Sequence, residues 1–154
     1  MFVDMPPGTG DIQLTLSQSS PLTGAVVVTT PQDIALIDAK KGLKMFEKVN
    51  VPLLGIIENM SVFICPCCGE VTHIFGEGGA KRMSEQYGVP MLGELPLSPA
   101  IREAADSGRP TVAAEPESAA AKMYRAIAMK IAGSIAKLGK DYTARMPTIS
   151  VKND

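Results

Sequence analysis

The chain has 154 residues, with 15 basic and 16 acidic side chains and a formal net charge of −1. That length allows one domain with a hydrophobic core, and the near-neutral balance argues against a nucleic-acid partner or a polybasic membrane patch. All three cysteines lie within four consecutive positions, unlike the spread disulfide framework of a secreted protein, so we expect a reducing, cytoplasmic location. Because no apolar run has the length of a membrane span and the first residues do not resemble a signal peptide, we expect no membrane partner.

Predicted strands and helices alternate along the chain. Residues 1–5 have the composition of the end of a short apolar strand, which Pro6, Pro7 and Gly8 stop. Residues 25–30, AVVVTT, are a continuous β-branched run that is typical of a strand buried on both faces. Further strands are predicted at residues 52–58 and 91–94, and helices at residues 11–17, 33–49, 78–87, 99–107 and 118–138.

The spacing of apolar and capping residues predicts how these helices begin, end and pack. Thr9 is expected to cap helix 11–17 and Ser98 to cap helix 99–107, which has Pro99 at its first position and Gly108 just past its end. Helix 33–49 is predicted to carry Ile34, Ile37, Lys41, Met45 and Val49 on one helical stripe. The apolar face of helix 118–138 is predicted to contain Ala120, Met123, Tyr124, Ile127, Ile131, Ile135 and Leu138.

This alternation predicts an α/β fold with a mainly parallel sheet flanked by helices. Ligands of such sheets bind beyond the carboxyl ends of the strands, which here carry Asp4, Thr30, Asn59 and Pro96. Residues 1–138 are predicted to form a single domain. Within it, the cysteine-bearing stretch at residues 60–75 interrupts the alternation of strands and helices. From residue 139 to residue 154 the apolar residues show no helical or strand periodicity, so we expect a flexible tail.

The stretch DMPPGTGD, residues 4–11, has features of a phosphate site. Asp4 at the tip of a strand can hold a water on phosphate-bound Mg²⁺, and Gly8 lets a backbone N–H approach a terminal phosphate. A strand followed by a Pro-Gly turn explains the same residues equally well. The lysine and the Ser or Thr of a P-loop, G-x-x-x-x-G-K-[ST], occur nowhere in the sequence.

Cys65 and Cys68 form a C-x-x-C pair, which can supply half of a four-thiolate site. The pair could therefore belong to a metal or cluster site shared between two subunits, act as a redox pair, or be structural. Gly69 and the β-type residues after it favour a hairpin-like ligand loop. Cys67 lies between the pair and should point away from what they bind. The spacing of His73 allows a ligand role, although a surface or hydrogen-bonded role is commoner for a lone histidine.

Two segments near strand ends could contact a nucleotide base. The amide of Asn59 can both donate and accept, as reading an adenine edge requires, and Pro96 with Leu97 could form a flat apolar wall. On spacing alone, a turn asparagine and a strand-to-helix loop are the simpler interpretations. Arg102 and Arg109 could reach a phosphate, but solvated or salt-bridged roles are commoner for such residues.

Taken in order, these segments resemble the Mrp/ApbC family of iron–sulfur cluster carriers, which are deviant P-loop ATPases related to MinD and the nitrogenase iron protein. The match runs from about residue 1 to about residue 138 and does not include the tail. The motifs that carry it are D-x-P-P-G-T-G-D, V-T-T-P-Q, E-N-M-S-x-F-x-C-P-x-C-G, T-H-I-F-G and L-P-L-x-x-x-I-R-E-x-x-D-x-G-x-P.

The resemblance implies a nucleotide site for ATP and Mg²⁺. Asp4 would be the switch II acid and Gly8 the glycine that faces the γ-phosphate. Asn59, Pro96 and Leu97 would lie at the adenine.

The resemblance also implies that Cys65 and Cys68 bind a [4Fe–4S] cluster, which bridges a homodimer with two thiolates from each subunit. The cluster would be transferred to apo iron–sulfur proteins in an ATP-dependent way. Cys67 lies at a variable position of the family motif, so the resemblance implies no role for it.

Family members begin with a strand and a GKGGVGKS/T-type P-loop, so this chain is similar to the C-terminal part of a carrier. Because the P-loop lysine and its backbone cradle are missing from the sequence, we expect that the chain alone does not hydrolyse ATP. In the family the P-loop strand lies between the strands at residues 1–5 and 25–30. Its absence predicts that these two strands pair directly, that another chain inserts a strand, or that residues 1–5 leave the sheet.

Other interpretations stay open beside the carrier. A zinc-binding dimerisation module without ATPase activity would use Cys65 and Cys68 from each chain. A MinD-like partitioning ATPase fits less well, because it leaves the cysteine pair unexplained and because helix 118–138 has few charges for a basic, membrane-binding helix.

Overall fold

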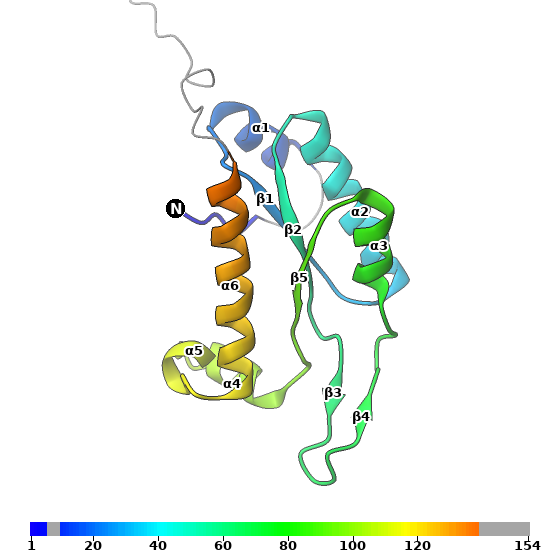
Figure 1. Cartoon of the computed structure of the whole chain (residues 1–154), viewed down its shortest axis with the longest axis vertical. Helices are drawn as coiled ribbons and strands as arrows, with labels where there is room; N and C mark the ends of the chain where they lie inside the picture. Colours follow the sequence, from blue (N-terminus) through cyan, green and yellow to red (C-terminus); the bar gives the residue numbers. More distant parts are fainter. Residues whose placement is uncertain (6–9, 139–154) are drawn as a thin grey trace, which may run out of the picture.

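The computed structural model describes residues 1–5 and 10–138, and its centre is a parallel sheet with the strand order β1–β2–β5 (Figure 1). These strands are β1 (Ala25–Thr29), β2 (Leu53–Glu58) and β5 (Met91–Glu94). Helices α2 (Asp33–Lys48) and α3 (Gly79–Tyr87) cover one face of the sheet, and α6 (Ala119–Lys137) covers the other. The predicted α/β architecture, a parallel sheet flanked by helices, is confirmed.

Smaller elements complete the described part of the chain: α1 (Asp11–Ser19), β3 (Phe63–Ile64), β4 (Val71–Thr72), α4 (Pro99–Asp106) and α5 (Thr111–Ala114). The sequence did not predict α5, because a single turn after a proline leaves no apolar period. None of the described helices is long and apolar enough to cross a membrane. The predicted flexible tail lies outside the described residues.

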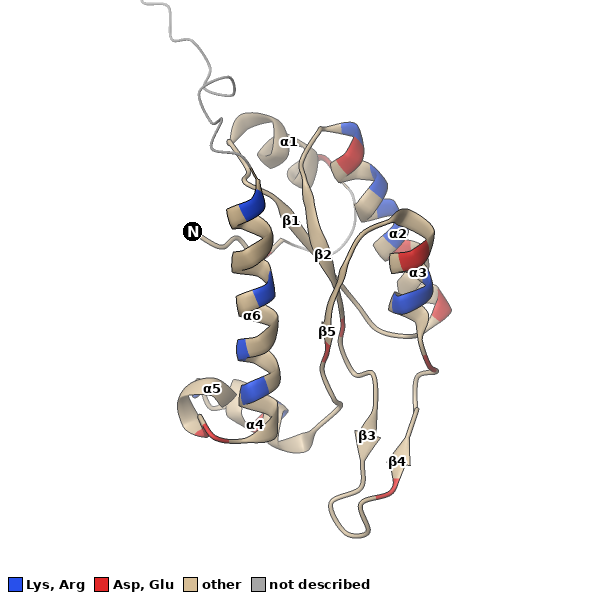
Figure 2. Cartoon of the chain, viewed as in Figure 1, with Lys and Arg blue, Asp and Glu red and all other residues tan. Residues whose placement is uncertain are grey.

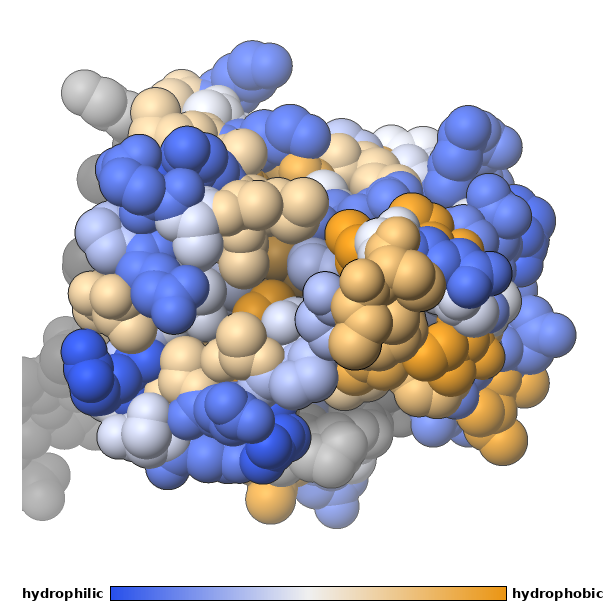
Figure 3. Space-filling model, turned by 90° about the horizontal axis from the view of Figure 1, so that it is seen from below, coloured by the Kyte–Doolittle hydropathy of each residue, from blue (hydrophilic) through white to orange (hydrophobic). Residues whose placement is uncertain are grey.

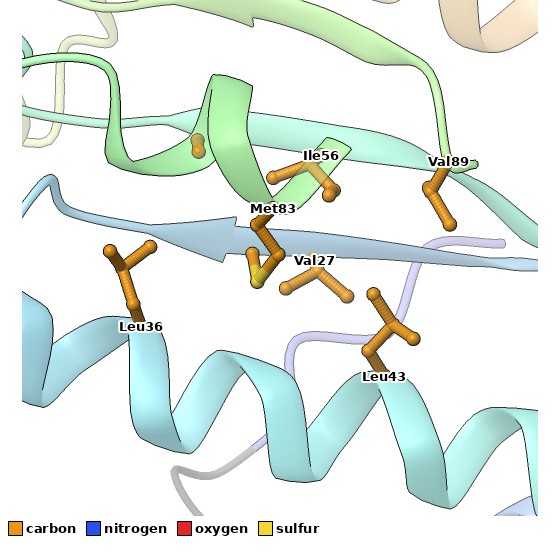
Figure 4. Packing of buried hydrophobic residues seen from close by; sticks show 7 residues of the cluster. Val27, Leu36, Leu43, Ile56, Met83 and Val89 are labelled. Carbon is orange, nitrogen blue, oxygen red and sulfur yellow. The ribbon is translucent and has the colours of Figure 1, made fainter. Parts of the chain in front are cut away.

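β2 is buried on both faces because its side chains alternate between two hydrophobic clusters. Ile56 is fully buried and packs with Leu43 of α2 and Met83 of α3 (Figure 4). Ile57 points to the opposite face, where it packs with Ile127 of α6. Truncation of a buried isoleucine to alanine typically lowers the free energy of unfolding by about 2–5 kcal/mol. The side chains of β2 therefore contribute strongly to the stability of the sheet.

α6 approaches the sheet closely at Gly93. A Cβ atom at this position would lie 2.6 Å from Cγ1 of Ile127, closer than packed carbon atoms come. The predicted apolar face of the helix is confirmed at Ile127, with Tyr124 and Ile131 packed beside it. Met123, assigned to the same face, is instead 40% exposed.

The stripe predicted for α2 is not the row of residues that packs against the sheet. Leu36 and Leu43 are 6% and 0% exposed, whereas Ile34 and Ile37 are 75% and 52% exposed. Leu36 and Leu43 lie about two helical turns apart, so they share the face that packs against β1. The sequence contains two apolar rows on this helix, and only the contact with the sheet distinguishes them.

The predicted strand at residues 1–5 does not form, and of the three expected outcomes the structure shows residues 1–5 lying outside the sheet. Phe2 is 89% exposed, and β1 is an edge strand among the described residues. A short apolar segment gains stability as a strand only by pairing with a neighbour and burying a face, and this segment does neither. The predicted cap Thr9 lies outside the described residues, and the N-cap position of α1 is Gly10.

Candidate metal centre at the carboxyl ends of the strands

The carboxyl ends of the sheet strands are joined by backbone hydrogen bonds. The N–H of Asn59 donates to the carbonyl of Thr29 at 2.7 Å, and the N–H of Leu95 donates to the carbonyl of Glu58 at 2.8 Å. These bonds hold the segments that follow β1, β2 and β5 at one edge of the sheet, which is where parallel α/β sheets bind ligands.

The incoming leg of the cysteine hairpin is fixed to the continuation of β5. Ser61 is 4% exposed, and its N–H and its hydroxyl both donate to the carbonyl of Leu95, at 3.0 and 3.2 Å. The N–H of Leu97 then donates to the carbonyl of Val62 at 2.8 Å. The backbone that carries Pro96 and Leu97 is therefore also the support of the hairpin.

The outgoing leg of the hairpin is fixed to the ends of β1 and β2. The carboxylate of Glu58 is buried and accepts a hydrogen bond from the N–H of Ala80 at 2.7 Å. Next to it, Gly79 lies so close to the loop that follows β1 that an added Cβ would be 2.7 Å from the carbonyl oxygen of Pro31. Sequence reasoning missed Glu58, although an acidic residue at the end of an apolar strand was a signal for such a role.

The cysteines lie in the turn of this hairpin, as predicted. Ile64 of β3 pairs with Val71 of β4, and the N–H of Cys65 donates to the carbonyl of Glu70 at 2.9 Å. The N–H of Gly69 donates back to the carbonyl of Cys65 at 2.9 Å. Gly69 has a φ of 74°, a conformation that glycine adopts readily, so the turn closes tightly after the cysteines.

The three thiols are free, with Cys65 half-buried and Cys67 and Cys68 exposed. The backbone N–H of Cys68, followed by that of Cys67, lowers the pKa of the Cys65 thiol by donating to its sulfur. The thiol of Cys68 adds to this effect, burial opposes it, and the thiol of Cys67 makes the smallest contribution. The expectation that Cys67 points away from whatever the pair binds stays a prediction.

The described residues supply only part of a metal-ligand set. They contain no group of three or more His, Cys, Asp and Glu side chains that could hold a metal ion. His73 lies at the base of the hairpin, with Nδ1 3.3 Å from the carbonyl oxygen of Ser61 and Nε2 4.0 Å from Oε1 of Glu77. The commoner, hydrogen-bonded role of this histidine is therefore the one that the geometry supports. Two neighbouring soft thiols fit half of a tetrahedral sulfur site.

The candidate nucleotide residues are brought together only in part. Asn59 is half-buried, and its side-chain oxygen accepts from the N–H of Met60 at 3.0 Å, as a turn asparagine does. Pro96 and Leu97 are half-buried at the same edge. Asp4 is exposed and outside the sheet, and Gly8 lies outside the described residues.

The two arginines weighed as phosphate ligands lie on the surface. Arg102 bonds Asp106 at 3.0 Å and Glu103 at 3.1 Å, all on the exposed side of α4. Arg102 therefore has the salt-bridged role rather than a free guanidinium positioned for a phosphate. Arg109 is exposed at the loop before α5.

Comparison with known proteins points to one family. A family described as "ParA: NUBPL iron-transfer P-loop NTPase" matches residues 1–132. The chain is 59% identical over 135 residues to an Escherichia coli K12 protein named "Iron-sulfur cluster carrier protein", covering 88% of this chain and 37% of that protein. It is 55% identical over 131 residues to the Mus musculus "Iron-sulfur cluster transfer protein NUBPL", covering 85% of this chain and 41% of that protein.

A solved structure agrees with these sequence matches. The nucleotide-binding protein of Archaeoglobus fulgidus, in complex with ADP, superposes with a TM-score of 0.63 at 39% identity. The alignment covers 74% of this chain and 46% of that one. The chain described here thus spans less than half the length of each of these three proteins.

Proposed function

Since the chain belongs to the NUBPL-type iron-transfer family of P-loop NTPases, we propose that it is part of an iron–sulfur cluster carrier. Its cargo is a [4Fe–4S] cluster, held between two copies of the chain by Cys65 and Cys68 of each. The recipients are apo iron–sulfur proteins, and the location is the cytoplasm, where thiols stay reduced.

The observation that carries this proposal is the incomplete ligand set on a projecting hairpin. Cys65 and Cys68 stand at the hairpin turn, and the described part of the chain contains no group of three or more His, Cys, Asp and Glu side chains that could hold a metal ion by itself. A four-thiolate site needs a second pair, which a second copy supplies in symmetric form. The exposed position of the turn leaves the pair accessible both to that copy and to a recipient.

The chain's own residues supply binding, charge and access. Cys65 and Cys68 bind as thiolates, and the N–H groups that lower the pKa of Cys65 favour this charged form. The hairpin legs fixed at Ser61 and Glu58 hold the pair at a set position relative to the sheet. Delivery is an exchange of these thiolates for thiolates of the recipient, which requires the exposure that Cys68 has.

On the nucleotide side, Asn59, Pro96 and Leu97 form the base-side wall, and Asp4 with Gly8 belongs to the phosphate side. ATP with Mg²⁺ would supply the energy that drives conformational change in the whole carrier. The sequence lacks the P-loop lysine, so we propose that this chain alone binds ATP weakly and does not hydrolyse it. Charge-assisted hydrogen bonds contribute about 1.5–3 kcal/mol each, and losing several would reduce affinity by orders of magnitude.

A second candidate function rests on the same thiols. Two C-x-x-C pairs, one from each of two copies, also satisfy the four-coordinate geometry of structural Zn²⁺. The chain would then be a dimerisation module rather than a carrier.

Anaerobic reconstitution with iron and sulfide, beside a parallel incubation with Zn²⁺, separates these functions. The carrier predicts brown protein with iron and acid-labile sulfide in equal amounts, and cluster that moves to an added apo iron–sulfur protein. Colourless protein that retains only zinc would support the dimerisation module, and protein that retains neither would refute both.

A further inference from the structure

A pair of exposed apolar side chains lies beside the cysteines. Ile64 and Val71 are directly opposite each other on β3 and β4, so both side chains stand on the same face of the hairpin. They are 51% and 57% exposed. Ile64 immediately precedes Cys65, so this exposed apolar pair, here called the hairpin pair, adjoins the thiols.

The position of the hairpin leaves this face open. β3 and β4 project from the body of the molecule beyond the ends of the sheet strands (Figure 1). Seen from that end, one of the apolar areas of the surface lies over the projecting hairpin (Figure 3). Contiguous exposed apolar side chains mark contact surfaces, whereas single scattered ones do not, and Ile64 and Val71 adjoin each other.

The incomplete ligand set indicates that the partner facing the hairpin pair is a second copy of the chain. A second copy that offers its own Cys65 and Cys68 must bring its hairpin turn to the first one. In a two-fold arrangement the same patch meets itself, so the hairpin pair of one copy approaches that of the other. This step rests on the proposed function, because it is the shared site that requires the second copy.

Charge and size make this contact dependent on bound metal. The segment from Val49 to Ala80 contains Glu58, Glu70 and Glu77 but no Lys or Arg, and the hairpin in Figure 2 carries no basic residue. Two such hairpins, each with the carboxylate of Glu70 beside its turn, repel each other until a cation lies between them. A stable interface buries about 800 Å² on each partner, which is more than the tip of a two-stranded hairpin offers, so apolar contact alone cannot hold the dimer.

We propose that Ile64 and Val71 form the apolar contact between two copies of this chain around the metal shared by their cysteines. The pair strengthens the metal-loaded dimer and excludes water from the ligand sulfurs, without binding the metal itself. Its partner is a second copy of the same hairpin.

The test compares Ile64→Thr and Val71→Thr with Ile34→Thr. Threonine keeps the β-branched shape that suits a strand, and Ile34 is a matched control because it is 75% exposed and belongs to α2 rather than to β3 or β4. The full chain is loaded with Co²⁺, whose absorption reports thiolate binding, and the dimer dissociation constant is measured by sedimentation. Each hairpin substitution should weaken the loaded dimer by about tenfold, since each occurs twice in a symmetric dimer, while Ile34→Thr changes nothing.

The readouts separate this inference from the proposed function. Unchanged dimer affinity in both hairpin variants, with the thiolate-to-Co²⁺ absorption intact, would overturn the role of the hairpin pair and leave the shared site standing. A wild-type chain that stays monomeric when loaded would instead refute the shared site. Circular dichroism of each variant checks that the fold is retained, and the two independent hairpin variants keep the test valid if one of them unfolds.

Discussion

The carboxylate of Glu58 accepts a hydrogen bond from the backbone N–H of Ala80 at 2.7 Å, between two residues that are 22 positions apart. Ala80 lies in the first turn of α3, where the helix dipole favours a negatively charged partner. The whole cysteine hairpin lies between the two residues. This single bond therefore ties the residue that follows the hairpin to the strand that precedes it.

Replacing Glu58 tests this link. In Glu58→Leu the buried N–H of Ala80 loses its acceptor, so we expect the free energy of unfolding to fall by about 1.5–3 kcal/mol. Glu58→Gln keeps an oxygen that can accept the bond and should lose clearly less. Urea unfolding followed by circular dichroism measures both variants, and equal losses would show that the hydrogen bond is not what stabilises this site.

Gly79 gives a steric test of the same leg of the hairpin. A Cβ atom there would lie 2.7 Å from the carbonyl oxygen of Pro31, and backbone cannot move aside cheaply. Gly79→Ala should therefore lower the free energy of unfolding by about 1–3 kcal/mol.

Gly133 supplies the control, because an added Cβ in this part of α6 meets nothing within 4 Å. Gly133→Ala should raise the free energy of unfolding by about 0.5–1 kcal/mol, as is usual for a helix interior. If thermal unfolding showed the two substitutions to be alike, the close approach of Gly79 to Pro31 would be wrong.

The cysteines should differ in their importance for cluster binding. We expect Cys65→Ala or Cys68→Ala to abolish iron–sulfur absorbance after anaerobic reconstitution, because each removes one thiolate of the pair. Cys67→Ala should keep most of it and serves as the control. Loss of the cluster in Cys67→Ala with retention in Cys68→Ala would mean that the ligand pair has been assigned to the wrong residues.

Cys65 should react with alkylating reagents at lower pH than an ordinary thiol. Donation from the backbone N–H groups of Cys68 and Cys67 lowers its pKa, so its reactive thiolate persists as the pH falls below the range where a free cysteine becomes protonated. Iodoacetamide labelling of metal-free chain across a pH series, followed by peptide mapping, measures the midpoint. A midpoint at or above that of a cysteine in an unstructured peptide would contradict these hydrogen bonds.

Local chemistry made much of the fold predictable. The β-branched run of β1, the apolar run of β2 and the spacing signals of α3, α4 and α6 all lie within single elements, and the structure contains each of these elements. Ser98 is at the N-cap position of α4, but its side chain makes no capping hydrogen bond. The hairpin was predictable for the same reason, because Gly69 and the β-type residues after it are neighbours in sequence.

The errors concern contacts between distant parts of the chain. Whether α2 buries Ile34 or Leu36 depends on how the helix sits on β1, and the apolar spacing of the helix contains no information on that. Residues 1–5 have the composition of a strand, but a strand needs a neighbour, which composition cannot supply. Glu58 went unnoticed because its partner, Ala80, is brought to it only by the completed fold.

The sharing of one cluster by two chains is most directly tested by native mass spectrometry of the anaerobically reconstituted chain. The account predicts a dimer that carries one [4Fe–4S] cluster, formed from chains that are monomeric before reconstitution, and no such species from Cys65→Ala. A monomer that retains a complete cluster by itself would contradict it.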